Sequence, residues 1–142
     1  MTNTLNHEAR TLRRHIAEQS LWAFAKMYLA EHLKHEPSVA HHEIYVLLKE
    51  ILERRGKRIA IAAPRGFGKS TLVTLLYVLY CIAFQQEKFV VLLSSTSAQA
   101  AQLLENIRRE LETNRKLLGD FQEFCEATGE DRIDTVAYGG SI

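Results

Sequence analysis

The sequence has few cysteines, little excess charge of either sign and no long apolar run, and each shortage excludes a class of protein. Its two cysteines, Cys81 and Cys125, lack the spacing of a zinc site or a disulfide framework, which fits a reducing cytoplasm. The net charge of +1, from 18 basic and 17 acidic residues, gives no indication of nucleic-acid binding.

Membrane insertion and secretion are also not expected. The most apolar stretch runs from Leu72 to Phe84, which is shorter than the ~17 to 25 residues that cross a bilayer. Residues 1–14 lack the apolar centre of a secretory signal. We therefore expect a cytoplasmic protein with no membrane partner.

A short glycine-containing loop is the most informative segment of the chain. It consists of Ala63, Pro64, Arg65, Gly66, Phe67, Gly68, Lys69, Ser70 and Thr71. Its spacing matches a Walker A phosphate-binding motif, with Ala63 in place of the usual first glycine. The alternative is a glycine turn that ends in a lysine by chance.

The residue types of this loop suit the binding of ATP with Mg²⁺. Gly66 and Gly68 permit backbone conformations in which successive N–H groups surround a phosphate. Lys69 opens a helix whose amino end attracts the same anion, and its ammonium reaches the β- and γ-phosphates. The Ser70 hydroxyl is expected to ligate Mg²⁺.

The segments around the loop predict the fold. Residues 58–62 and 89–93 are short apolar runs typical of buried parallel strands, and residues 70–84 between them read as a helix. Thr96 and Gln99 match a capping box that starts a long helix with an apolar stripe towards Leu118. We expect an α/β fold, a partial P-loop NTPase in which helices flank a parallel β-sheet.

Helices are also predicted before the loop. Residues 8–34 form one or two helical pieces that end before Pro37, and a further helix starts at Ser38 or His41 and stops near Gly56. This organisation predicts an N-terminal helical region over 1–56 and a P-loop ATPase core over 57–142 that is incomplete at its C-terminus. Residues 132–138 are a candidate for one more strand.

The histidines and the charged residues of the long helix are further candidates for binding sites or ion pairs. The pairs His32 with His35 and His41 with His42 lack a third ligand, so no zinc site is expected. His42 and Tyr45 either border the adenine or pack as part of an amphipathic helix. On the long helix, Glu105 with Arg109 and Glu112 with Lys116 stand at i,i+4 and suggest ion pairs on a solvated face.

The acidic centre that ATP hydrolysis requires is not evident in the sequence. The apolar run at 89–93 ends in serines, Asp120 follows Gly119 at a helix end, and Asp131 and Asp134 lie in polar surroundings. Either the acid comes from beyond residue 142, or the chain binds nucleotide without turning it over.

From about Trp22 to its end, the chain resembles the N-terminal part of the ATPase domain of phage terminase large subunits. The most specific agreement is the loop at 63–71, because these enzymes commonly carry Pro-Arg-Gly where other P-loop proteins begin with glycine. Weaker agreement lies in His42-Glu43, in residues 94–100 and in 138–142. These enzymes continue into a Walker B segment and a nuclease domain that are not in this sequence.

The resemblance implies a set of partners and one further site residue. It implies ATP and Mg²⁺ as cofactors, and double-stranded DNA, a portal protein and a small terminase subunit as partners of a complete protein. That protein would form a homo-oligomeric ring in the cytoplasm of a bacterial host cell. Arg65 is then an arginine finger or sensor that acts with Lys69 in catalysis, whereas otherwise it is a surface arginine that caps a carboxylate.

Two other functions remain open at this point. A P-loop small-molecule kinase uses the same loop to hold its donor phosphates, but it needs an arginine-rich lid and an acceptor pocket. A non-catalytic prophage remnant would retain nucleotide binding alone.

Overall fold

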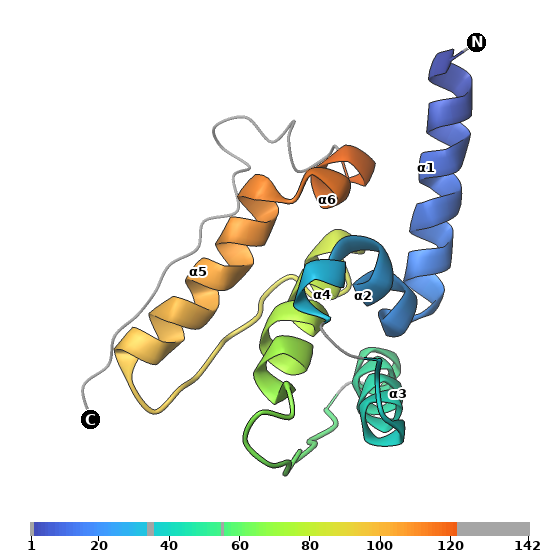
Figure 1. Cartoon of the computed structure of the whole chain (residues 1–142). Coiled ribbons are helices and arrows are strands. Elements are labelled where there is room, and N and C mark those ends of the chain that lie inside the picture. Colours follow the sequence, from blue (N-terminus) through green and yellow to red (C-terminus); the bar gives the residue numbers. More distant parts are fainter. Residues whose placement is uncertain (1, 34–35, 55, 122–142) are drawn as a thin grey trace.

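The computed structural model describes residues 2–33, 36–54 and 56–121, and this part of the chain is mainly helical (Figure 1). The helices are α1 (Thr2–Gln19), α2 (Leu21–Tyr28), η1 (Ala30–His32), α3 (Val39–Glu53), η2 (Thr71–Leu76), α4 (Tyr77–Ala83), α5 (Ser97–Thr113) and α6 (Arg115–Asp120). Of these, η1 is a 3₁₀ turn, and η2 is a π-helical stretch that leads directly into α4. None of the described helices combines the length and the apolar character needed to cross a bilayer.

The predicted parallel β-sheet is wrong. Across the described residues there is no β-strand, so the chain does not show the α/β architecture of a P-loop NTPase. Residues 57–64 and 89–94, which cover both expected strands, have no regular secondary structure, and they lie before η2 and after α4 in the chain. The predicted strand at 132–138 lies outside the described residues.

The error has a physical cause. A strand depends on backbone hydrogen bonds to a neighbouring strand, whereas a helix satisfies its backbone internally. The apolar run at 89–93 has no such neighbour, and its side chains are largely in solvent: Phe89 is 82% exposed and Leu93 is 88% exposed. An apolar run therefore shows that a segment suits a buried strand, but it does not supply the partner.

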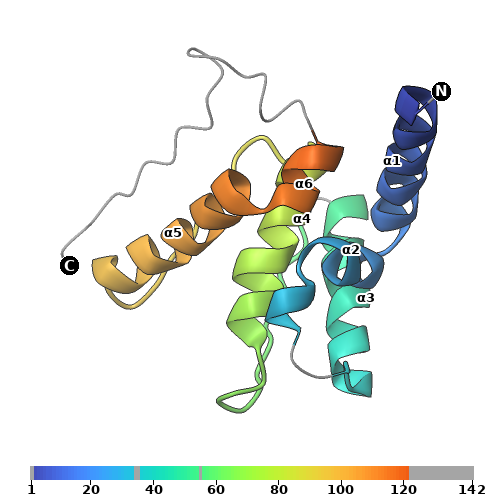
Figure 2. The ribbon, with the colours of Figure 1, turned by 45° about the horizontal axis from the view of Figure 1, so that its top comes forward.

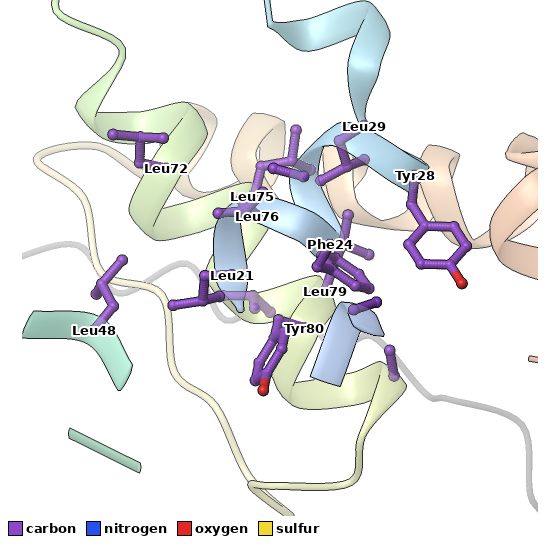
Figure 3. Close-up of a cluster of buried hydrophobic side chains, with 14 of the residues drawn as sticks. Leu21, Phe24, Tyr28, Leu29, Leu48, Leu72, Leu75, Leu76, Leu79 and Tyr80 are labelled. Atoms are coloured by element: carbon purple, nitrogen blue, oxygen red, sulfur yellow. The ribbon is translucent and has the colours of Figure 1, made fainter. Parts of the chain in front are cut away.

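The core is built where η2 and α4 cross α2 (Figure 3). Phe24 of α2 is fully buried and packs edge-on against Tyr80 of α4, with ring centroids 5.5 Å apart. Leu48 of α3 and Leu79 of α4 join the same apolar cluster, so the cluster takes residues from both sides of Gly56. The apolar character of 72–84 is thus explained by its position at the centre of a helical layer.

The other helices surround this centre, with α1 and α5 on opposite sides of α4 (Figure 2). Where one or two helical pieces were expected before Pro37, the structure has α1 and α2, followed by the short turn η1. Ser20 separates α1 from α2, and its Oγ accepts a hydrogen bond from the Ala23 amide at 3.4 Å. The α3 helix begins after Ser38, as predicted.

The long C-terminal helix is interrupted at Asn114. Its start is as expected, with Thr96 Oγ1 accepting from the Gln99 amide at 3.2 Å. Asn114 then ends α5 and caps α6, so Glu112 and Lys116 fall in different helices and do not form the predicted i,i+4 pair. The ion pair observed on this face joins Arg108 to Glu112 at 2.8 Å.

Candidate phosphate-binding loop

The glycine loop forms a tight turn directly before η2. The Phe67 amide donates to the Pro64 carbonyl at 3.3 Å, which closes a four-residue turn with Arg65 and Gly66 at its centre. Gly66 has φ 84°, the left-handed value that the third position of a type II turn requires. Gly68, with φ 83°, repeats this conformation two residues later. A side chain at either position would meet no neighbour but would strain the backbone.

Two amides of this turn are available to a ligand. Within the described residues, the N–H groups of Gly66 and Gly68 have no acceptor. The following helix starts here as well, because the Leu72 amide donates to the Gly68 carbonyl at 3.0 Å. The loop therefore presents unpaired donors beside the amino end of a helix, which is a favourable surrounding for an anion.

Lys69 folds its side chain back over the loop. Its half-buried ammonium donates to the carbonyl oxygens of Ala63 at 2.8 Å and of Pro64 at 3.2 Å. These contacts hold the positive charge beside the glycine turn. Since an ammonium has three protons, one donor remains for a further acceptor.

The other predicted site residues lie in solvent or near it. Arg65 and Ser70 are exposed, and Thr71 is half-buried. Arg65 has no ion pair among the described residues, so the alternative in which it caps a carboxylate finds no support there. The Ser70 carbonyl accepts from Thr74 Oγ1 at 2.5 Å, and the Ser70 side chain makes no capping hydrogen bond to the helix that follows.

His41 connects the loop to α3, a contact that sequence reasoning missed. Its ring stacks on Phe67 with centroids 4.2 Å apart and planes inclined by 6°, and its Nε2 lies 3.0 Å from the Phe67 carbonyl oxygen. The Ser38 amide donates to Nδ1 at 3.1 Å. Nδ1 is therefore the acceptor, and Nε2 carries the proton that it donates to Phe67. The spacing Ser38-x-x-His41 was the available signal, because it resembles a capping box.

His42 and Tyr45 pack with Trp22. The three rings contact one another with centroids 5.8 to 6.1 Å apart, between α2 and α3. This arrangement matches the amphipathic-packing alternative for the two residues. The described part of the chain also holds no group of three or more His, Cys, Asp or Glu side chains placed to bind a metal.

Cys81, the cysteine within the described residues, is an ordinary core thiol. It is fully buried in α4, and burial raises its pKa to about 11. A thiol of this kind is chemically inert at neutral pH, because the reactive form is the thiolate. It plays no part in the loop.

Comparison with known proteins adds no relative. No family model, no curated protein and no solved structure matches this chain. What can be said of the loop therefore rests on its own geometry. That geometry comprises two left-handed glycines, two amides without an acceptor and one ammonium beside them.

Proposed function

We propose that residues 64–71 bind the phosphates of ATP together with Mg²⁺, and that the chain is the ATP-binding N-terminal portion of a terminase large subunit. In that role it would belong to the ATPase motor that packages double-stranded viral DNA into capsids. The observation that supports the phosphate site best is the pair of left-handed glycines on either side of Phe67, next to the Lys69 ammonium.

The residues of the loop fit a phosphate chain. The amides of Gly66 and Gly68 supply neutral donors, and Lys69 supplies the charge that favours an anion. To reach a phosphate, the ammonium exchanges the carbonyl oxygens of Ala63 and Pro64 for an ionised oxygen, which forms the stronger hydrogen bond. The exposed Ser70 hydroxyl is the group that would hold Mg²⁺.

The family part of this proposal has a separate basis. It depends on the resemblance of residues 63–71 to the terminase loop, and it assigns double-stranded DNA, the portal and the small subunit to a complete protein. The phosphate site does not depend on that assignment, and neither part includes a β-sheet. The two parts are therefore tested separately, and the phosphate site is tested first.

The test is a titration with a fluorescent ATP analogue in the presence of Mg²⁺. We expect Lys69→Ala to weaken binding about tenfold or more, because it removes the charge-assisted hydrogen bond to the phosphates. Lys88→Ala is the matched control, since Lys88 is an exposed lysine outside the loop. It should leave the dissociation constant unchanged within about twofold.

A second substitution tests the backbone. Gly68→Ala places a side chain on a residue with φ 83°, so it should shift the turn and weaken binding of the ATP analogue without changing any charge. Equal affinity for wild type, Lys69→Ala and Gly68→Ala would end the proposal. Loss of the Mg²⁺ dependence in Ser70→Ala would support the assignment of that hydroxyl.

A further inference from the structure

A cavity of about 750 Å³ lies between α1, α2 and α6, away from the loop. Its volume is within the range that small-molecule sites occupy, about 300 to 1,000 Å³. The half-buried Met27 and the buried Tyr28 of α2 form part of its wall. The polar lining comes from α1 and from α6: Asn6, His7, Arg10, Arg13, Arg115, Lys116 and Asp120.

The one carboxylate in this lining is already neutralised. Arg13 binds Asp120 with both arms of its guanidinium, from Nε to Oδ2 at 2.7 Å and from Nη2 to Oδ1 at 2.5 Å, and the Tyr28 hydroxyl donates to Oδ2 at 2.9 Å. Burial alone would raise the pKa of Asp120, but these hydrogen bonds and the nearby arginines outweigh it and lower the pKa. Asp120 therefore does not compete for further cations.

Three further cations line the cavity from α1 and from α6: Arg10, Arg115 and Lys116. None of them forms a salt bridge within the described residues, although the charge of Arg10 contributes to the lowered pKa of Asp120. A second cavity, between α1, α2 and α3, shows the contrast. Its lysine, Lys49, caps the end of α1 by donating to the carbonyls of Glu18 and Gln19, and it is accompanied by Glu50 and Glu53.

We propose that the cavity lined by Arg10, Arg115 and Lys116 binds a compact anion with adjacent phosphate groups, of the size of a di- or triphosphate. A guanidinium group can donate two parallel hydrogen bonds to the oxygens of one phosphate. Three cations from two helices therefore suit an anion that carries several negative charges. The concave shape favours a compact ligand over a nucleic-acid backbone, which tracks along an open groove. This site is independent of the glycine loop.

The test uses inorganic triphosphate, titrated calorimetrically in the Lys69→Ala background with a chelator, so that the loop and Mg²⁺ contribute nothing. The test variant adds Arg10→Gln and Lys116→Gln. The matched control adds Arg109→Gln and Lys88→Gln, which remove the same charge from exposed positions outside the cavity. We expect the test variant to bind about tenfold or more weakly than its background, and the control to change by less than about twofold.

Further arms separate the sources of the anion and control for folding. Citrate, with a similar charge and no phosphate, should bind more weakly than triphosphate, and a single-stranded thymidine oligonucleotide should not depend on Arg10 and Lys116. Thermal unfolding checks that each variant is folded, and Arg115→Gln alone is a milder test variant. Equal triphosphate affinity in test and control variants would overturn the proposal, as would a dependence on Arg10 and Lys116 seen with the oligonucleotide alone.

Discussion

Phe24 and Phe89 lie in two different environments, the helical core and an irregular segment. Phe24 of α2 is fully buried among Tyr28, Tyr80 and Phe84, whereas Phe89 of the irregular segment before α5 is 82% exposed. Both residues lie in strongly apolar sequence. An apolar segment therefore becomes part of the core only where a second element covers it, and a helix can provide that cover because its own backbone hydrogen bonds are already made.

Alanine substitutions at the two phenylalanines test this difference in burial directly. Phe24→Ala should lower the free energy of unfolding by about 3 to 5 kcal/mol, because it removes a buried ring and leaves a cavity. Phe89→Ala should change it by less than about 0.5 kcal/mol, since the side chain is in solvent. Urea denaturation followed by circular dichroism measures both. A large loss in Phe89→Ala would show that the segment at 89–93 packs against a partner.

A buried charge extends the comparison to polar groups. Asp120 is almost fully buried, so Asp120→Asn should cost about 1 to 3 kcal/mol, because it removes the negative charge and one of the two oxygens that accept from Arg13 and Tyr28. The exposed pair of Arg108 with Glu112 provides the control. Glu112→Gln should cost about 0.5 kcal/mol or less.

The contribution of Asp120 should also depend on pH. Its pKa is lower in the folded protein than the value of about 3.9 for an unfolded chain, so its stabilising effect is complete above about pH 4. The effect is lost as the pH falls through the lower folded pKa. The difference in unfolding free energy between wild type and Asp120→Asn should therefore shrink in strong acid. A constant difference from pH 7 to pH 2 would contradict the ion pair.

His41 connects the helical core to the glycine loop, and its removal should have a smaller effect on stability. His41→Ala removes both the acceptor for the Ser38 amide and the donor to the Phe67 carbonyl, and should cost about 1 kcal/mol, as the loss of a helix cap does. Because the ring positions Phe67 between the two glycines, the variant should also bind the ATP analogue more weakly. Val39→Ala, at an exposed position of the same helix, is the control. Unchanged analogue binding in His41→Ala would limit the role of His41 to the cap.

Local sequence signals predicted much of the helical structure. Ser38 and Thr96 precede α3 and α5 as expected, because a hydroxyl at that position is the usual partner of the first amides of a helix. The left-handed turns at Gly66 and Gly68 were expected for a similar reason, since glycine alone adopts them without strain. These features involve residues only a few positions apart.

The sheet failed because its evidence was of a different kind. The apolar composition of 58–62 and 89–93 predicts strands. A strand, however, also needs a neighbouring strand to which its backbone can hydrogen-bond, and composition does not identify that neighbour. The contact of His41 with Phe67 was missed for the same reason, since 26 positions separate the two residues. Asn114 is a residue type that commonly caps helices, but the apolar stripe continues past it to Leu118 and therefore suggested one unbroken helix.

Helix starts, the bend of the glycine turn and the residue types around it could be predicted from the amino-acid sequence, because each depends on hydrogen bonds within about four positions. The packing of the whole chain was needed to bring Arg13 to Asp120 across 107 positions, to stack His41 on Phe67 and to leave Phe89 in solvent. Such outcomes depend on which surfaces meet when helices pack, and the free energy of that packing is shared among residues from the whole chain.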